Sequence, residues 1–440
     1  MRTTAEQPAA PATGETHRLK KLRVLVLATT FPRRENDREP RFVHDLTKHL
    51  AKKVSLWVLV PGAPGARTYE EMDGVRIIRF PYFFPKCWQR LCYDGGILPK
   101  LNSSCLARLQ LPFFLLAQFY FLCRTARRLQ INFIHCHWLI PQGFFTALFN
   151  VWSRVPYILT AHGGDVFSFR NHSLMNRLRN FALKRARLCT VNSVSTRKAV
   201  ESLGEKVPLK LIPMGVDTTL FHPDRYNPEI RIQLDIEDLF LLGVGRFAEK
   251  KGFQYLIQAM PLILKKRPRA KLVLIGFGPC ADELGRLVRR LNLTQSVLFP
   301  GSRFGVELAE FFATADIFIG PSVVTEEGDT EGQGVVFLEA MASRTAVVAS
   351  DVGGVSGVVR DCRTGLLVPQ RKPESLAGKI LLLSENPALR NELTRNGREL
   401  VENHYSWEKT AQTFLETYSE VFPLSPAPRE RGNPLDRRVP

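Results

Sequence analysis

Hydrophobic residues follow two alternating patterns along most of this chain of 440 residues. Short continuous apolar runs bounded by turn residues, such as KLRVLVLATTF from Lys21, predict buried parallel strands. Segments with apolar residues at helical spacing follow these runs, as at Phe42, Leu46 and Leu50. The repeated order of strand, helix and strand predicts an α/β fold with doubly wound sheets, in which ligands bind at the carboxyl ends of the strands.

This alternation begins twice, which predicts two domains. The first covers residues 21–215 and contains further expected strands in INFIHCHW, YILTAH, CTVNSVS and KLIPMGVD. The second covers residues 216–404, from the strand in FLLGVGR to the strand in TGLLVP. A final helix is expected in SWEKTAQTFLETYSEVF, within residues 405–422. Residues 1–20 and 423–440 show no hydrophobic periodicity, so we expect a disordered lead and a disordered tail.

One apolar segment departs from the alternation. Residues 111–123, LPFFLLAQFYFLC, are apolar on nearly every face, with Arg108 before them and Arg124, Arg127 and Arg128 after them. Thirteen residues are too few to span a bilayer, which needs about 20. Two interpretations remain open, a core helix or a helix lying in the membrane interface with basic flanks. The basic segment RLRNFALKRAR, residues 177–187, repeats this pattern more moderately.

The net charge of +19 lies entirely in the first half of the chain. Residues 1–220 hold 33 Lys and Arg against 14 Asp and Glu, whereas residues 221–440 hold 28 of each kind. Such asymmetry favours an anionic partner for the N-terminal half, such as a membrane surface, a phosphorylated acceptor or nucleic acid. No segment resembles a nucleic-acid-binding module, so we expect no nucleic acid partner.

The cysteines and histidines indicate neither disulfides nor a metal site. The eight cysteines show no pair separated by two residues, and residues 1–20 lack the apolar core of a secretory signal. We therefore expect reduced thiols in a cytosolic compartment. His135, Cys136 and His137 are consecutive, but adjacent strand positions point to opposite faces, which disfavours a shared metal ion.

Two carboxylates bracket a glycine-rich turn in the second domain. Glu331 and Glu339 flank a Gly-Gln-Gly turn that opens an apolar helix, and a strand and the pair Gly353-Gly354 follow. A helix that begins at such a turn presents unpaired N–H groups and the positive end of its dipole, which suits an anion. One carboxylate could face the outer part of a ligand while the other reaches a hydroxyl pair. Solvated acids in a plain βαβ unit are the alternative.

The order of motifs resembles the family 4 glycosyltransferases. Glu, seven residues, Glu, then Ala-Met-Ala, a strand and Gly-Gly is similar to their nucleotide-sugar signature. The resemblance covers roughly residues 22–422 and includes TAHGGD (160–165), IPMGVD (212–217), GVGRFAEKKGF (243–253) and LIGFGP (274–279). It implies the GT-B fold, in which two Rossmann-like domains face a cleft. It also implies that the helix within residues 405–422 crosses back to the first domain.

Two cations after a strand of the second domain suit a departing diphosphate. Arg246 and Lys251 are five residues apart near the expected mouth of the cleft, where they can stabilise developing negative charge without Mg²⁺. An Asp-x-Asp pair, which is typical of metal-using enzymes, does not occur in the sequence. We therefore expect no cofactor and no metal, and a UDP-, GDP- or ADP-sugar as the donor.

The resemblance assigns roles to individual residues. It implies that Glu339 accepts hydrogen bonds from ribose hydroxyls and that Glu331 holds hydroxyls of the donor sugar. His162 would reach the sugar near its reacting carbon, and Asp165 would orient that histidine or line the acceptor side. The expected catalytic residues are His162, Asp165, Arg246, Lys251 and Glu331. The expected donor-binding residues are Gly245, Arg246, Lys251, Gly276, Gly278, Arg303, Glu331, Gln333, Gly334, Val335 and Glu339, with Arg303 beside the base.

These expectations combine into one functional hypothesis. We expect a retaining glycosyltransferase of polysaccharide biosynthesis that acts on a glycan or lipid-linked glycan. It would bind the inner face of the cytoplasmic membrane peripherally, through its basic N-terminal half. Retention by same-face transfer is what the resemblance implies, since the sequence identifies no carboxylate nucleophile for a double displacement. A nucleotide-sugar epimerase of the same fold and a non-catalytic membrane-associated scaffold are the alternatives.

Overall fold

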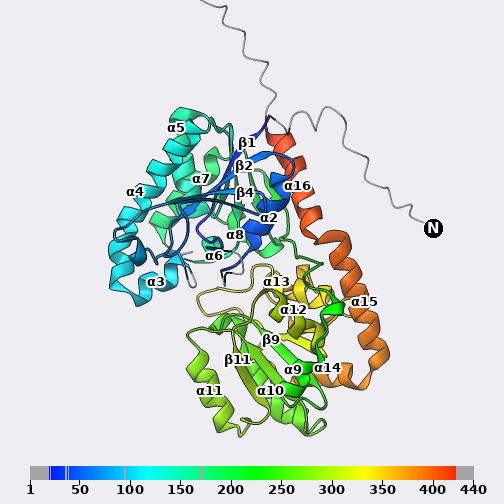
Figure 1. Ribbon diagram of the computed structural model, residues 1–440. Helices are drawn as coiled ribbons and strands as arrows, with labels where there is room; N and C mark the ends of the chain where they lie inside the picture. The colour runs from blue at the N-terminus through cyan, green and yellow to red at the C-terminus, as the bar shows by residue number, and fades with distance from the viewer. Residues whose placement is uncertain are drawn as a thin grey trace, which may run out of the picture.

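The computed structural model describes residues 19, 21–34, 37, 39–93, 96–168 and 172–422. Nearly all of the predicted lead, residues 1–20, and the whole predicted tail, residues 423–440, lie outside these described residues. Figure 1 shows an upper and a lower part, each built on its own sheet with helices around it. We call them the N-terminal unit (β1–β8) and the C-terminal unit (β9–β14).

The N-terminal unit contains a sheet of eight strands in the order β3-β4-β2-β1-β5-β6-β7-β8, parallel except for the pair β3 and β4. The strands are β1 (Arg23–Leu27), β2 (Ser55–Pro61), β3 (Tyr69–Met72), β4 (Val75–Phe80), β5 (Phe133–His137), β6 (Tyr157–Ala161), β7 (Leu188–Val191) and β8 (Leu209–Leu211). The α-helices are α2 (Phe42–Ala51), α3 (Ile97–Ser103), α4 (Cys105–Arg128), α5 (Phe144–Ser153), α6 (Gly164–Phe167), α7 (Ser173–Arg185) and α8 (Val194–Glu201).

The C-terminal unit contains a parallel sheet of six strands in the order β11-β10-β9-β12-β13-β14. The strands are β9 (Phe240–Val244), β10 (Lys271–Ile275), β11 (Val297–Gly301), β12 (Ile317–Gly320), β13 (Ala346–Ser350) and β14 (Leu366–Val368). The α-helices that follow β8 are α9 (Pro228–Gln233), α10 (Phe253–Leu264), α11 (Ala281–Arg290), α12 (Gly305–Thr314), α13 (Val335–Ala342), α14 (Pro373–Glu385), α15 (Pro387–His404) and α16 (Trp407–Val421).

Both faces of each sheet are buried, as the continuous apolar runs predict. In β1, Val24 and Val26 pack into one core while Leu25 and Leu27 pack into another on the opposite face. The strands of the C-terminal unit divide their side chains between two cores in the same way. The α/β fold class with two doubly wound sheets is thereby confirmed, whereas the exact domain boundaries stay a prediction.

Helix α16 lies against the N-terminal unit although it follows the C-terminal unit in the chain (Figure 1). Its residues Trp407, Phe414 and Tyr418 join the core that contains Val24 and helix α2. The Tyr418 hydroxyl lies 2.7 Å from Nδ1 of His135 in β5. The last helix therefore ties the end of the chain back to the first sheet.

Helix α4 is longer than the apolar run within it. It covers 24 residues, because Ser104 caps its first turn and the arginines after Cys123 continue the helix. The expectation that it is too short to cross a membrane was wrong, since α4 passes that test by length and composition and is the one helix of the described residues to do so. One face is buried, at Phe114 and Leu122, and the other is exposed.

Candidate active site

The centre of the site is an ion pair between two segments of the C-terminal unit. Lys251 ends the turn after β9, and its Nζ lies 2.5 Å from Oε2 of Glu331 in the loop before α13. The two side chains are 15% and 13% exposed. Burial alone would raise the pKa of Glu331, but the charge and hydrogen bond of Lys251 outweigh burial and lower this pKa. Glu331 is therefore an ionised carboxylate with a fixed cation beside it.

Three predicted glycines let the loops after β9 and β10 lie against each other. A Cβ on Gly245 would lie 3.3 Å from Cε of Lys251. A Cβ on Gly276 would lie 1.9 Å from the Gly245 carbonyl oxygen, and one on Gly278 would lie 2.4 Å from that of Phe247. Because the neighbours of Gly276 and Gly278 are backbone atoms, side chains at these two positions would force the loops apart. Gly276 and Gly278 thus set the position of the Gly245 loop beside Lys251.

The turn that opens α13 depends on glycines in two segments. Gly334 has φ of +77°, and a Cβ there would lie 2.5 Å from the Phe337 ring. A Cβ on Gly353 would lie 2.3 Å from the Glu331 carbonyl oxygen, and one on Gly354 would lie 1.8 Å from that of Gly332. The Gly354 amide also donates to the Glu331 carbonyl oxygen. The second glycine pair therefore supports the backbone of the loop that carries Glu331.

Glu339 in α13 has a strongly perturbed acidity. Burial raises the pKa of its carboxyl to about 7, with Lys251 opposing this rise and Asp45 adding to it. Asp45 belongs to α2 of the N-terminal unit. Val335, at the start of α13, likewise packs against the core that contains α2. The first turns of α13 thus face the N-terminal unit, which the spacing of the two glutamates alone did not indicate.

His162 follows β6 in the N-terminal unit and is held by its neighbours. Its Nε2 lies 2.9 Å from Nδ1 of His137, and the two rings are stacked with centroids 5.1 Å apart. Burial lowers the pKa of His162 to about 3, so the ring is neutral at physiological pH. The Asp165 carboxylate accepts hydrogen bonds from the backbone N–H groups of His162 and Leu139, at 3.0 and 2.8 Å. Of the two expected roles for Asp165, this geometry favours orienting the histidine segment.

His135 and His137 lie on the same face of β5, since they are two residues apart. Their rings stack with centroids 4.4 Å apart, whereas Cys136 contacts Thr146 elsewhere. His135 is 2.7 Å from both the Tyr418 hydroxyl and the Thr160 hydroxyl. Within the described ranges, no group of three or more His, Cys, Asp or Glu side chains is arranged to hold a metal ion.

The loops at the carboxyl ends of the two sheets meet at Gly332. A Cβ there would lie 3.0 Å from the His162 carbonyl oxygen, and the Ser195 hydroxyl donates to the Gly332 carbonyl oxygen at 3.4 Å. Gln333 makes two further bonds across the junction. Its Oε1 accepts from the Met214 N–H at 2.7 Å and its Nε2 donates to the Met214 carbonyl oxygen at 3.0 Å. The side-chain amide of Gln333 thus joins the two units, and its expected contact with the donor stays a prediction.

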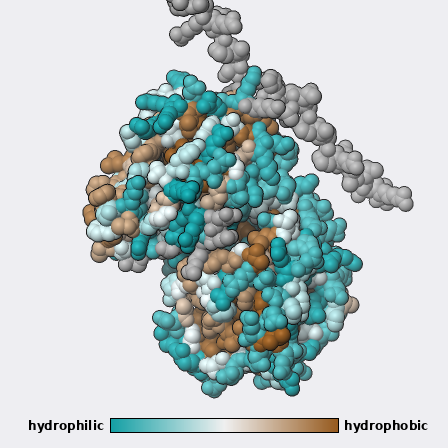
Figure 2. All heavy atoms as spheres, in the orientation of Figure 1, coloured by the Kyte–Doolittle hydropathy of each residue, from teal (hydrophilic) through white to brown (hydrophobic). Residues whose placement is uncertain are grey.

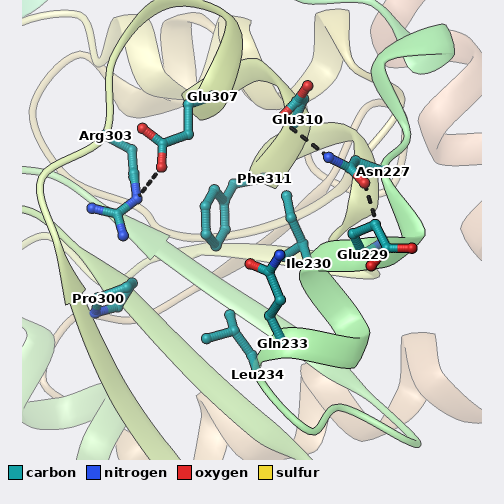
Figure 3. A pocket seen from close by; sticks show the side chains of 10 residues that line it. All are labelled: Asn227, Glu229, Ile230, Gln233, Leu234, Pro300, Arg303, Glu307, Glu310 and Phe311. Carbon is teal, nitrogen blue, oxygen red and sulfur yellow. Dashed lines mark hydrogen bonds and ion pairs between the residues drawn. The ribbon is translucent and has the colours of Figure 1, made fainter.

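Arg303 lines a cavity that these residues do not line. It borders a cavity of about 150 Å³ between α9, the end of β11 and α12, where its Nε is 2.5 Å from Oε1 of Glu307 (Figure 3). The residues that line this cavity include none of Lys251, Glu331 and Glu339. Arg246, five residues before Lys251, is partly buried. The contact of Arg303 with a nucleotide base stays a prediction.

The structure thus brings Lys251, Glu331, Glu339 and the start of α13 close to the His162 segment. Sequence reasoning missed Asp45, His137 and the Met214 backbone as neighbours of these residues. A signal existed for His137 alone, because positions two apart on a strand share a face. Asp45 and Met214 reach the site only through the approach of the two units.

Comparisons with known proteins agree with this architecture. The model of glycosyltransferase family 4 matches residues 40–220, and that of glycosyl transferases group 1 matches residues 227–400. An uncharacterized glycosyltransferase of Methanocaldococcus jannaschii is 30% identical over 65% of this chain and 74% of its own length. A GDP-mannose-dependent alpha-(1-6)-phosphatidylinositol monomannoside mannosyltransferase of Mycobacterium tuberculosis is 30% identical over 50% of this chain and 58% of its own length.

A solved structure extends the likeness to nearly the whole fold. The sucrose-phosphate synthase of Thermosynechococcus elongatus superimposes with a TM-score of 0.75 at 24% identity, over 91% of this chain and 99% of that chain. At this identity the likeness shows the fold, which is GT-B. Together with the two family models and the archaeal relative, it establishes that the chain belongs to the family 4 glycosyltransferases and is an enzyme of that class.

Proposed function

We propose that this glycosyltransferase moves a sugar from a nucleotide-diphosphate sugar to a glycan or lipid-linked glycan in polysaccharide biosynthesis, with retention of anomeric configuration. The observation that carries this proposal is the Lys251–Glu331 pair beside Glu339, at the junction where the His162 segment approaches. Two relatives support a nucleotide-sugar donor. The Mycobacterium tuberculosis relative is GDP-mannose-dependent, and HepE of Anabaena, a fold neighbour at 20% identity, was solved in complex with UDP-glucose.

The donor would lie along the loops after β9 and before α13. Lys251 and Arg246 would neutralise the diphosphate, and the N–H groups of Gly334 and Val335 would add donors at the positive end of α13. Glu339 would accept hydrogen bonds from the ribose hydroxyls. Glu331, already held by Lys251, would bind hydroxyls of the sugar next to the leaving diphosphate.

The transfer would break the bond between the sugar's anomeric carbon and the diphosphate oxygen. An acceptor hydroxyl would attack from the same face, and its proton would pass to the departing phosphate oxygen. Lys251 and Arg246 would stabilise the charge that develops on the leaving group. In many transferases a metal ion has this role, so we propose that the reaction here needs no metal. Neutral His162 would contact the sugar by hydrogen bonding, because its low pKa leaves the ring uncharged.

We also propose a location in the cytoplasm, bound peripherally at the inner face of the cytoplasmic membrane. The excess of positive charge in the N-terminal half supports binding to an anionic membrane surface. A lipid-linked acceptor would be presented at the same surface.

The test is a panel of UDP-, GDP- and ADP-sugars, with nucleotide release measured with and without a membrane lipid extract. Release from one donor that rises strongly with the extract is the expected result, and product linkage by NMR should show retention. An inverted linkage would contradict the same-face reaction. An epimerised nucleotide-sugar formed without acceptor would identify an epimerase instead. Binding of one nucleotide without turnover under all conditions would identify a scaffold.

A further inference from the structure

Helix α4 presents a continuous apolar face to solvent. Its exposed residues recur every three or four positions, which places them along one side of the helix. The apolar ones are Leu106, Leu109, Phe113, Leu116 and Tyr120, which we call the α4 outer face. Leu116 is 71% exposed and Leu109 is 58% exposed. A row of five large apolar side chains in water is unusual for a soluble protein and marks an interaction surface.

Aromatic side chains outside α4 widen this surface at two points. The Phe83 ring packs edge-on against Phe113 and stacks on Trp88, which is half exposed. Further along the helix, Phe119 packs edge-on against Trp152 of α5, which is also half exposed. Figure 2 shows hydrophobic residues gathered along the outer edge of the N-terminal unit, where Figure 1 places α4. Tryptophan is typical of membrane interfaces, where its ring meets both headgroups and acyl chains.

The sequence around this surface is rich in basic residues. Residues 95–164 contain no Asp or Glu, and their six cationic residues are Lys100, Arg108, Arg124, Arg127, Arg128 and Arg154. The arginines at the C-terminal end of α4 are exposed and continue the line of the α4 outer face. The surface therefore combines a row of apolar side chains with cations at its end, which is the pattern of a helix lying in an anionic membrane interface.

We propose that the α4 outer face docks the enzyme on an anionic lipid bilayer, with α4 lying in the plane of the interface. The inference deepens the peripheral location proposed above and rests on it, but vesicle binding needs no turnover. Under this proposal both interpretations that the sequence left open apply to α4, because one face packs in the core and the other would meet lipid.

The buried face of α4 does not suit a helix that crosses the bilayer. At 1.5 Å per residue its 24 residues extend about 36 Å, which is sufficient length. However, Phe114 and Leu122 belong to the core beneath the sheet, and Gln110 donates a hydrogen bond to the Trp88 carbonyl oxygen at 2.7 Å. A crossing would remove these residues from the unit and bury Gln110 and Gln118 in hydrocarbon, where unpaired polar groups are costly.

A second copy of the chain is a poorer occupant than a bilayer. In a two-fold dimer the same face would meet itself, so its cations would meet a surface segment, residues 95–164, that contains no Asp or Glu. The C-terminal half offers no compensating excess of acid, with 28 basic and 28 acidic residues. An anionic membrane supplies both the apolar phase and the negative charge.

The orientation has a consequence for the acceptor. Helix α3 and the turn Lys86–Trp88 precede α4, and Figure 1 shows α3 at the end of α4 nearer the C-terminal unit. Docking along α4 therefore brings the bilayer to the side of the N-terminal unit that continues toward the junction of the two units. A lipid-linked acceptor could keep its tail in the membrane while its glycan reaches the site.

The experiment is co-flotation of the full chain with vesicles of phosphatidylcholine alone, or with about a third phosphatidylglycerol. We expect binding to anionic vesicles that weakens with salt. The double variant Leu109→Glu, Leu116→Glu should reduce binding at least about tenfold, because two apolar side chains that would be buried in the bilayer interface are replaced by charged ones. Ile232→Glu is the matched control, since Ile232 is 69% exposed on the C-terminal unit, and it should bind like the wild type.

A second pair of variants separates charge from apolar burial. Replacing Arg124, Arg127 and Arg128 with Gln should weaken binding by about a hundredfold at low salt and less at high salt. The same replacement of three exposed arginines on α11 (Arg286, Arg289 and Arg290) removes equal charge and should change binding little. Equal binding to neutral and anionic vesicles would overturn the proposal, as would full binding by the Leu109→Glu, Leu116→Glu variant.

Two further readouts distinguish the ways of failing. If the glutamate variant dissociates a dimer in size-exclusion chromatography but floats like the wild type, the face is a protein interface and the proposal is wrong. Nucleotide binding measured on every variant reports folding and the donor site. Its retention together with lost flotation is expected, whereas normal flotation without any nucleotide binding would contradict the proposed function and leave the docking surface intact.

Discussion

The Lys251–Glu331 pair allows a test that separates its contribution to stability from its contribution to catalysis. We consider Lys251→Met, Glu331→Gln and the double variant. At an effective dielectric constant of about 20, two unit charges roughly 3 Å apart attract by about 5 kcal/mol, and desolvation offsets much of this. Because the side chains are 15% and 13% exposed, each single change should cost about 2.5 kcal/mol, slightly below the range for fully buried pairs.

The double variant should cost about 3 kcal/mol rather than 5, because neither partner is left behind as an uncompensated charge. The coupling free energy is then about 2 kcal/mol, measured from denaturant unfolding followed by tryptophan fluorescence. The neighbouring pair Lys250–Asp329 is the control. Its atoms are 3.1 Å apart but its side chains are 30% and 39% exposed, so its coupling should stay below about 1 kcal/mol.

Activity should not recover in the double variant. Lys251→Met removes a cation from the proposed diphosphate site, which should lower kcat/KM by about 10²–10³. Adding Glu331→Gln should cost only about 0.5 kcal/mol more and supplies no cation, so the double variant should remain at least as slow. A coupling below about 0.5 kcal/mol would refute the argument from burial. A Lys251→Met enzyme within about threefold of wild-type kcat/KM would refute the role at the diphosphate.

Three further predictions concern pH, backbone packing and metal. Burial and Asp45 raise the pKa of Glu339 to about 7, so nucleotide affinity should rise as pH increases through that value and the carboxyl becomes a charged acceptor. In calorimetric titrations, Asp45→Asn should move the midpoint of this rise to lower pH, whereas the control Asp73→Asn should not. Gly354→Ala should lower the free energy of unfolding by about 1–3 kcal/mol, since its Cβ would lie 1.8 Å from a backbone oxygen, whereas Gly357→Ala has no atom within 4 Å and should cost less. Dialysis against EDTA should leave turnover unchanged, and a loss that Mg²⁺ restores would show that a metal takes part.

The sheets could be predicted because their signals are local. The strands β1, β9 and β10 are each a short apolar run between turn residues. Such runs are continuous because both faces of the strand are buried. The same holds for Gly334 and the pair Gly353-Gly354, since the need for glycine arises from the turn itself and from a loop nearby. These features do not depend on how the two units approach each other.

The extent of α4 could not be predicted from its apolar run. The run ends at Cys123, but arginine is a good helix former, so the helix continues to Arg128 without any apolar residue to mark it. The exposed face of α4 is also apolar, so apolar and polar positions do not alternate with the period of a helix that is buried on one side. Counting only the apolar run therefore gave too short a helix.

Contacts across the junction could not be predicted from the sequence for a different reason. Gln333 and Met214 are 119 residues apart, and nothing in either segment indicates the other. Gln333 stands in a motif that points to the donor, so the motif gave no indication of its contact with Met214. Asp45 affects Glu339 only because α2 and α13 approach in space.

The loop before α13 performs two tasks within three consecutive residues. Glu331 pairs with Lys251 inside the C-terminal unit, while Gly332 and Gln333 contact Ser195 and Met214 of the N-terminal side. A change in this loop therefore alters donor contacts and the junction of the units together, so its effect on activity cannot be assigned to one cause. Lys251 reaches the same carboxylate from the turn after β9 and makes no recorded hydrogen bond across the junction among the described residues. Its replacement leaves the contacts across the junction in place, and the comparison with the double variant separates the lost cation from the unpaired Glu331 carboxylate, which makes it the more informative perturbation.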